Sequence, residues 1–256
     1  MALHDATADA GLLERAEAAV RWSMRERAAE GGGFRHGADA ALGLALLDTL
    51  AMGRAFLALH AATANPEWLP RARAAARFVQ SHFCSAAHAG CAAADAPAGA
   101  AGVFARPVLD VLENASVTRF ANLLFRYTGD LQDKALAEKA GRFLAAARTL
   151  AANGPLPGTL LADRELRAEP VHVTVVGAAG DTSAAALFAA ARRLPNAYAR
   201  TDRWDGQGPL PLNTATRYPP SDAAAAYVCG PRFCSAPVSD PALLAATVDK
   251  VTRAQR

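Results

Sequence analysis

The chain has 256 residues, of which 52% are apolar and 20% are charged, and its net charge is +3. This length and apolar content suffice for one large domain or two modest ones, and they argue against a disordered chain. Lysines and arginines are scattered, without the long basic run expected of a nucleic-acid-binding protein. We therefore predict no nucleic-acid partner.

Membrane and export signals are also missing from the sequence. No uncharged apolar stretch reaches the length of about 18 residues that a membrane-spanning helix needs. The amino terminus, MALHDATADAG, lacks the basic head and apolar run of a secretory signal. We predict no membrane association and a cytoplasmic location by default. That expectation lapses if the chain is a piece of a longer protein, in which a signal would lie elsewhere.

Residues 48–78 and 113–143 form an internal repeat. They align without a gap at an offset of 65 residues, with seven identities in 31 positions. Two identities are alanines in an alanine-rich chain, so the weight rests on five pairs: Arg54/Arg119, Leu59/Leu124, Thr63/Thr128, Arg77/Arg142 and Phe78/Phe143. Apolar residues recur at helical spacing around the turns Thr-Ala-Asn-Pro and Thr-Gly-Asp-Leu. Each unit therefore predicts two helices joined by a short turn.

A partial third copy lies upstream, because residues 13–22 resemble residues 69–78 at an offset of 56. It contains only the second helix of a unit, predicted over residues 12–27. We expect that the helix that should cover it was removed, or comes from another chain or from a longer parent protein. Repeated helical hairpins stack as a solenoid or close into a ring, since each buries its apolar face against its neighbours. We predict a mainly α fold, with an incomplete α/α toroid of helical hairpins over residues 1–160.

After Gly154 the composition changes, and we predict a small α/β subdomain over residues 161–256. Three prolines in residues 155–170 indicate a linker at its start. Two strands and two helices are predicted beyond it: residues 171–177 and 223–229 as strands, and residues 184–193 and 241–253 as helices. We expect a small, partly parallel sheet with flanking helices.

A candidate site is predicted where the loops after the second helices lead into the next first helices. These loops are GGGFRHG (31–37) and GVFARP (102–107). A radial arrangement of hairpins would gather them at one end, and carboxylates beside Arg and His suit general acid–base chemistry on a sugar or other polyol. The candidate catalytic residues are Asp48, Asp110, Glu113 and His36. The candidate substrate-binding residues are Arg35, Thr49, Arg106 and Asn114.

Capping is the alternative for Asp48, Thr49, Glu113 and Asn114. Acids, Asn and Thr are favoured at helix starts by their hydrogen bonds to backbone amides and by the helix dipole. Arg54 and Arg119 lie one or two turns further along the same helices. We expect these arginines to be buried ion-pair partners of the acids.

The remaining chemical motifs are weak. HFCSAAHAGC (82–91) has the residue types of a zinc site, but its spacings match no common zinc motif, which favours a flexible loop. Cys229 and Cys234 either form a disulfide or are buried small side chains, and their spacing disfavours a thioredoxin-like motif. GAAGDTS after the first strand favours a tight turn over a phosphate loop, because it lacks the lysine and the glycine spacing. We predict no cofactor and no metal ion.

Five segments carry a family resemblance: GGGFRHG, LLDTLAMGRAFLALHAAT, ENASVTRFANLLFRYTGD, EPVHVTVVGAAGD and AYVCGPRFCSAPVSDPALL. Through them the chain resembles the carboxy-terminal region of the thioredoxin-domain-containing family that includes spermatogenesis-associated protein 20. Members of that family carry a thioredoxin-like domain followed by an α/α toroid similar to N-acylglucosamine 2-epimerases and six-hairpin glycosidases. The resemblance implies the tail of a larger protein or a shortened relative, with a carbohydrate-sized cleft at the helix-entry end. It implies no particular catalytic residues.

Two functional hypotheses follow from the sequence. The first is a toroid fragment related to sugar-processing folds that binds a carbohydrate. The second is a non-catalytic module that packs against a thioredoxin-like domain or a second copy of itself, because a face left uncovered by the missing helix would expose apolar surface. The sequence does not decide whether the chain is an enzyme.

Overall fold

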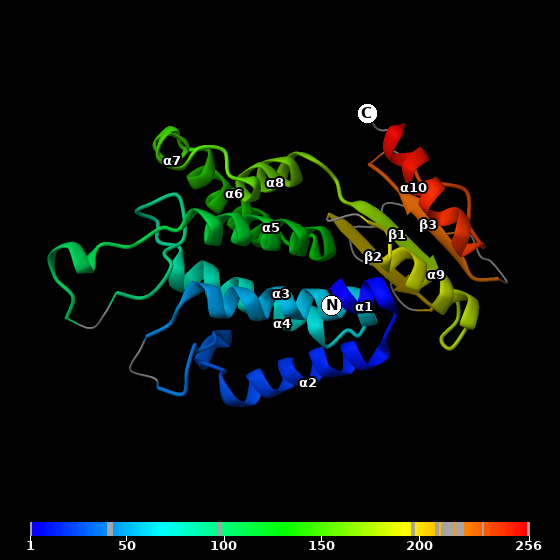
Figure 1. Cartoon of the computed structure of the whole chain (residues 1–256), viewed down its shortest axis with the longest axis horizontal. Helices are drawn as coiled ribbons and strands as arrows, with labels where there is room; N and C mark the ends of the chain where they lie inside the picture. Colours follow the sequence, from blue (N-terminus) through cyan, green and yellow to red (C-terminus); the bar gives the residue numbers. More distant parts are fainter. Residues whose placement is uncertain are drawn as a thin grey trace.

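The computed structural model describes residues 2–39, 43–96, 99–195, 198–207, 210, 218, 223–231 and 233–254 (Figure 1). The fold is mainly helical, with a small three-stranded sheet. The long helices of the amino-terminal part lie side by side, and the sheet with its two covering helices lies at one end of them, on the right in Figure 1. The predicted mainly α fold class is confirmed.

The two repeats fold as two helical hairpins. In the first, α3 (Leu46–Thr63) is followed by α4 (Trp68–Phe78), and in the second, α5 (Val111–Thr128) is followed by α6 (Leu131–Ala145). The first hairpin continues beyond α4 as one π-helical turn, η3 (Val79–Phe83). The predicted hairpins are confirmed.

The turns of the two hairpins have the same hydrogen bonds. The hydroxyl of Thr63 accepts from the amide of Asn65 at 3.1 Å, and the hydroxyl of Thr128 accepts from the amide of Asp130 at 3.2 Å. The next side chain, Asn65 or Asp130, then accepts at 2.9 Å from the amide two residues further on. Between them, Ala64 and Gly129 have positive φ angles. The identical threonines of the repeat therefore fix the turn that sets each helix pair.

Helix α2 (Ala10–Glu26) is the partial third copy, and a short helix α1 (Ala2–Thr7) precedes it. The guanidinium group of Arg21 on α2 bonds the carboxylate of Glu67, just before α4, at 3.0–3.2 Å. Arg77, the equivalent of Arg21 on α4, pairs with Asp133 on α6. The same arginine thus joins each second helix to the next.

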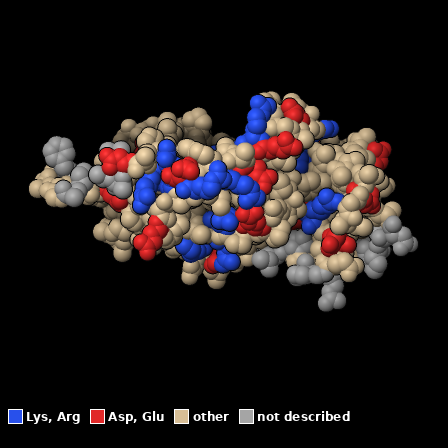
Figure 2. All heavy atoms as spheres, turned by 90° about the horizontal axis from the view of Figure 1, so that it is seen from below, with Lys and Arg blue, Asp and Glu red and all other residues tan. Residues whose placement is uncertain are grey.

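Basic and acidic side chains lie interspersed on the face shown in Figure 2.

The helical core lies between the hairpins. Leu50, Phe56, Trp68, Phe120 and Leu124 are buried there in one cluster. Gly53 allows α3 and α5 to approach, because a Cβ atom at this position would lie 2.7 Å from the Phe120 ring. The apolar face of each hairpin is therefore buried against its neighbour.

The predicted linker is wrong. Residues in this stretch form α8 (Pro157–Arg167), which packs on α5 and follows a short helix α7 (Ala147–Asn153). Pro157 lies at the first helical position, where its missing N–H costs no hydrogen bond. Prolines in this segment start a helix, and the predicted boundary at residue 160 lies inside it.

The sheet has the order β2–β1–β3. β1 (Val171–Val176) pairs with β2 (Ala199–Trp204) in parallel and with β3 (Ala225–Cys229) in antiparallel orientation. The helices α9 (Thr182–Arg192) and α10 (Leu244–Arg253) pack against it. The predicted strands at β1 and β3, both helices and the partly parallel pairing are confirmed, whereas β2 was not predicted.

In the turn between β1 and α9, the backbone amides donate to a side chain of the same turn. The carboxylate of Asp181 accepts from the amides of Ser183 at 2.7 Å and Ala184 at 3.3 Å. These are the amides that would hold a phosphate at a helix start. The predicted tight turn is confirmed. Three 3-10 turns also lie among the described residues: η1 (Glu30–Gly32), η4 (Gly102–Ala105) and η5 (Pro241–Leu243).

Within the described part of the chain, no helix combines the length and the apolar character needed to cross a bilayer.

Candidate functional site

The first turns of α3 and α5 bring the predicted acids together. Asp48 lies in the first turn of α3, and Asp110 is the cap of α5, where its carboxylate accepts from the amide of Glu113 at 2.8 Å. Asp48 and Glu113 occupy equivalent repeat positions. Packing of α3 against α5 therefore places two carboxyl groups at one end of the helical part.

His36 joins this cluster through Asp48. Its Nδ1 atom lies 3.1 Å from Asp48 Oδ1, and its side chain is 83% exposed. The other oxygen, Asp48 Oδ2, is buried and accepts no hydrogen bond from the described residues. Asp48 thus has one oxygen oriented by an exposed imidazole and one enclosed oxygen with free acceptor capacity.

The environment of the cluster changes the pKa of Glu113. Partial burial raises its pKa above the usual value, and the negative charges of Asp110 and Asp48 raise it further. Its Oε2 atom is also buried and receives no hydrogen bond from the described part of the chain. Glu113 therefore keeps its proton to higher pH than an ordinary glutamate does.

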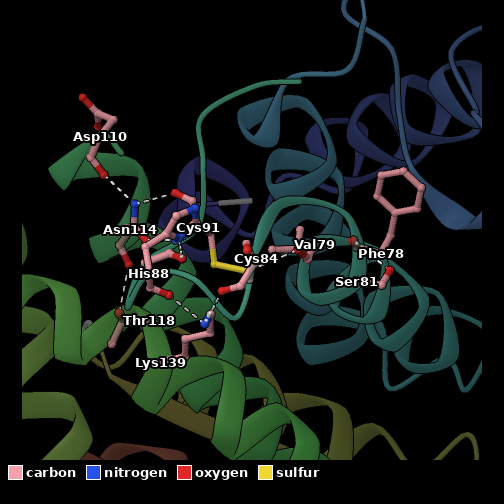
Figure 3. Close-up of a disulfide and its surroundings, with 12 residues drawn as sticks. Phe78, Val79, Ser81, Cys84, His88, Cys91, Asp110, Asn114, Thr118 and Lys139 are labelled. Carbon is pink, nitrogen blue, oxygen red and sulfur yellow. Dashed lines mark hydrogen bonds between the residues drawn. A yellow bond between two sulfur atoms is a disulfide. The ribbon is translucent and has the colours of Figure 1, made fainter. Parts of the chain in front are cut away.

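Thr49 and Asn114 bond backbone groups, and Figure 3 shows Asn114 with its partners Cys91 and Asp110. Both are fully buried at equivalent repeat positions. The Thr49 hydroxyl accepts from the amide of Phe34 at 3.0 Å. The Asn114 amide bonds the backbone N–H and C=O of Cys91 at 2.8 and 3.0 Å and the carbonyl of Asp110 at 2.8 Å. These side chains hold the incoming loops against the helices and are not accessible to a ligand.

The two predicted arginines of the loops do not contact the acids. Arg35 is half-buried and Arg106 is exposed, and neither side chain makes an ion pair with a residue in the described ranges. Of the eight predicted site residues, the structure gathers His36, Asp48, Asp110 and Glu113.

The loop over residues 84–91 is closed by an unpredicted disulfide between Cys84 and Cys91. The Lys139 ammonium donates to the carbonyls of Ser85 at 2.7 Å and His88 at 2.9 Å, which fastens the loop to α6 (Figure 3). The predicted flexible loop is therefore tied at several points, and its cysteines are not available as metal ligands. No group of three metal-ligating side chains forms among the described residues.

Cys229 and Cys234 also form a disulfide, at the end of β3. Of the two alternatives left open by the sequence, the structure has the covalent one. A disulfide of this pair links the last strand to the segment that follows it. This bond lies outside the acid cluster and supplies no group to it.

A second candidate site lies in a cavity of about 750 Å³ between α3 and α5 on one side and α1, the end of α9 and the start of β2 on the other. Several repeat-related pairs line it: Ala51/Ser116, Arg54/Arg119, Ala55/Phe120 and Ala58/Leu123. The sequence prediction missed it. The signal was present, because these positions follow helical spacing and include an identical arginine in both repeats.

Arg54 and Arg119 do not pair with the acids at the helix entries, contrary to expectation. Arg119 on α5 bonds the buried carboxylate of Glu165 on α8 at 2.8–3.0 Å. Arg54 is exposed to the cavity and has no ion-pair partner within the described ranges. Both arginines line the cavity, whereas Asp48 and Glu113 do not.

No protein-family model matches this chain, and no curated protein matches it either.

Proposed function

We propose that the helix-entry end of α3 and α5 binds a carbohydrate or similar polyol, and that Glu113 and Asp48 offer a proton donor and a proton acceptor to it. The observation that carries this proposal is the gathering of His36, Asp48, Asp110 and Glu113 at the first turns of α3 and α5. Burial and the charges of Asp110 and Asp48 raise the pKa of Glu113 there. A carboxyl group that keeps its proton to higher pH, beside a second carboxyl group, is an arrangement that acid–base chemistry on sugars uses.

Apolar surface beside the acids supports a sugar ring as the ligand. Leu47 and Leu112, at equivalent repeat positions next to the first-turn acids, are 50% and 58% exposed. Sugars present apolar C–H faces between their hydroxyl groups, so a site that combines exposed aliphatic side chains with carboxylates can contact both. The carboxylate of Asp48, whose side chain is 21% exposed, and that of the exposed Asp110 can accept hydrogen bonds from hydroxyl groups.

We infer that the helical part is a portion of an α/α toroid. In support of this, α5 packs on α3 and α8 packs on α5, so three first-type helices follow one another side by side. The second helices α2, α4 and α6 are linked by the ion pairs of Arg21 and Arg77. Such a succession of inner and outer helices is the arrangement that the family resemblance implies.

Calorimetric titration with N-acetylglucosamine, N-acetylmannosamine and glucose tests the carbohydrate proposal. We expect binding of at least one sugar with a Kd in the millimolar range, weakened about tenfold or more by Asp48→Asn and by Glu113→Gln. Glu138→Gln is the matched control, because Glu138 is an exposed acid on α6. No binding at about 10 mM sugar, or equal loss in the control variant, would contradict the proposal.

A second candidate function is a docking module for a thioredoxin-like domain or a second copy of the chain. It is favoured by exposed apolar side chains at the helix-entry end: Leu47, Val103, Val108 and Leu112. Light scattering of the purified chain, alone and with a thioredoxin-like protein, tests it. A complex that Leu112→Glu abolishes would support docking, and a monomer that binds no such partner would exclude it.

We also propose that the protein works in an oxidising compartment. All four cysteines are paired in two disulfides, and such bonds are rare in the cytoplasm. This inference replaces the cytoplasmic location expected from the sequence. Trapping of thiols at the moment of cell lysis, followed by mass spectrometry, tests it, since four alkylated cysteines would show that the bonds are absent in the cell.

A further inference from the structure

The cavity between α3, α5 and α9 has a charge distribution that the carbohydrate proposal does not use. Four arginines line it: Arg54, Arg119, Arg192 and Arg193. Two carboxylates line it as well, those of Asp5 and Glu165. Its volume of about 750 Å³ lies within the range of small-molecule sites.

Both carboxylates are already neutralised by one arginine each. Glu165 accepts from Nε and Nη2 of Arg119, and Asp5 accepts from Nε at 3.2 Å and Nη2 at 2.7 Å of Arg192. In both pairs the Nη1 atom donates to no acceptor in the described part of the chain. The pairs are thereby held in place while each keeps free N–H donors.

Arg54 and Arg193 are the other two arginines that line the cavity. Arg54 lies midway along α3 and Arg193 directly follows α9, and both are exposed. Neither makes an ion pair with a residue in the described ranges. Since no further carboxylate lines the cavity among these residues, it carries excess positive charge.

Tyr198 also lines the cavity and carries a hydroxyl group. Its hydroxyl oxygen accepts from the amide of Asn122 at 2.8 Å and from Nε of Arg126 at 3.3 Å. With two hydrogen bonds accepted, the hydroxyl has only its own proton left to offer. Burial raises the pKa of Tyr198, so the hydroxyl keeps this proton at neutral pH. Tyr198 therefore favours an acceptor in the cavity over a donor.

Between its arginines, the helical wall of the cavity is mainly apolar. Ala55 and Ala58 on α3 and Phe120 and Leu123 on α5 line it between the charged groups. The alanines leave the space open, while the larger residues supply contact area. A ligand that fills this space needs an apolar body as well as an anionic group.

We propose that this cavity binds a small organic anion, with its carboxylate or phosphate group held by the guanidinium groups of Arg54 and Arg193 and by the hydroxyl of Tyr198. The inference does not depend on the acid cluster at the helix entries. The carboxylate and the phosphate share the chemistry that the site recognises: negative charge and oxygen acceptors for N–H and O–H donors.

Calorimetry with matched probes tests the proposal. The anionic probes are inorganic phosphate, succinate and glucose 6-phosphate, and the neutral probes are succinamide and glucose. We expect at least one anion to bind with a Kd below about 1 mM, and its neutral counterpart to bind about tenfold more weakly or not at all. Succinate alone would identify a carboxylate ligand, and glucose 6-phosphate alone a phosphorylated one.

Variants connect the binding to the cavity. Arg54→Gln and Arg193→Gln should each weaken anion binding about tenfold, and Tyr198→Phe should weaken it while keeping the ring. Arg25→Gln is the matched control, because Arg25 is an exposed arginine of α2 that does not line the cavity. Asp48→Asn separates the two sites, since it should leave anion binding unchanged.

Three results would overturn the proposal. One is that no anionic probe binds at about 10 mM. Another is that Arg25→Gln weakens binding as much as Arg54→Gln does, which would show a response to net charge. The third is that Arg54→Gln and Arg193→Gln both leave the affinity for the anion unchanged, while the unfolding temperatures of both variants match that of the wild type.

Discussion

The guanidinium group of Arg77 on α4 pairs with the carboxylate of Asp133 on α6, a side chain with no exposed surface. The other oxygen of Asp133 accepts from the Thr128 hydroxyl at 2.7 Å. Removal of the arginine would leave a buried carboxylate without its counter-charge. We expect Arg77→Met to lower the free energy of unfolding by about 3 kcal/mol or more, measured by urea denaturation.

A neighbouring arginine provides the control for this pair. Arg73 bonds the carboxylate of Asp130 at 2.8 Å, but its side chain is 49% exposed. We expect Arg73→Met to cost less than about 1 kcal/mol, as exposed ion pairs do. If both variants lose the same stability, the buried pair does not link the hairpins in the way described.

Closure of the 84–91 loop gives a second prediction. The disulfide between Cys84 and Cys91 closes a short loop, for which the chain-entropy estimate is about 2 kcal/mol. We expect Cys84→Ala together with Cys91→Ala to lower the free energy of unfolding by about this amount. Lys139 and Asn114 hold the same loop, so the variant should keep the near-native circular dichroism spectrum. Global unfolding at room temperature would show that these hydrogen bonds cannot hold the loop alone.

We expect the free energy of unfolding to decrease as the pH falls, because His60 is harder to protonate in the folded protein. Burial lowers the pKa of His60, whose Nδ1 atom lies 3.2 Å from the Asn65 carbonyl and whose ring packs edge-on against Tyr127. As the pH falls below 6.5, the ordinary pKa of histidine, His60 is protonated in the unfolded chain before it is protonated in the folded protein. The free energy of unfolding therefore decreases until the pH reaches the pKa of His60 in the folded protein. Urea denaturation at pH 7.5 and 5 should show a smaller difference for His60→Gln than for the wild type.

A packing variant separates this titration from simple loss of stability. Leu57→Val removes one buried methylene from α3 and should cost about 1 kcal/mol at both pH values. Its pH dependence should match the wild type. An unchanged pH dependence in His60→Gln would assign the effect to other groups.

The sequence predicts the hairpins because their periodicity and their turns agree. Thr63 and Thr128 are identical in the repeat and make the same turn hydrogen bond, so the residues that aligned are the ones that fix the geometry. The sequence does not predict β2, because Arg200 and Asp202 give this segment a polar pattern. Both are buried, with Arg200 Nε 2.7 Å from Asp202 Oδ2, and burial of an ion pair leaves no apolar pattern to recognise.

The structure gathers only part of the predicted site, for a related reason. Asp48 and Glu113 lie in the first turns of their helices, as their positions in the repeat indicate, and their catalytic role stays a prediction. Thr49 and Asn114 have the same residue types as ligand-binding groups, but their hydrogen bonds go to distant loops that the sequence does not place. The cavity depends on α9 and β2, which lie far along the chain, so its closure could not follow from the repeat alone.

Glu113 should cost the protein stability at neutral pH. Its pKa is raised in the folded protein, chiefly by burial and then by the charges of Asp110 and Asp48. A raised carboxyl pKa contributes stability below the ordinary value of 4.5, and this contribution is lost as pH rises through the folded pKa. At pH 7 the ionised group is therefore unfavourable in the folded state.

We expect Glu113→Gln to raise the unfolding temperature by about 1–3 °C at pH 7. At pH 4 the difference should shrink, because the carboxyl group is then protonated in the folded protein. Differential scanning calorimetry at the two pH values measures this, with Glu138→Gln on the exposed face of α6 as the control. A lower unfolding temperature for Glu113→Gln at pH 7 would mean that the ionised carboxylate has a favourable partner, and Glu113 could not then be the proton donor of the proposed site.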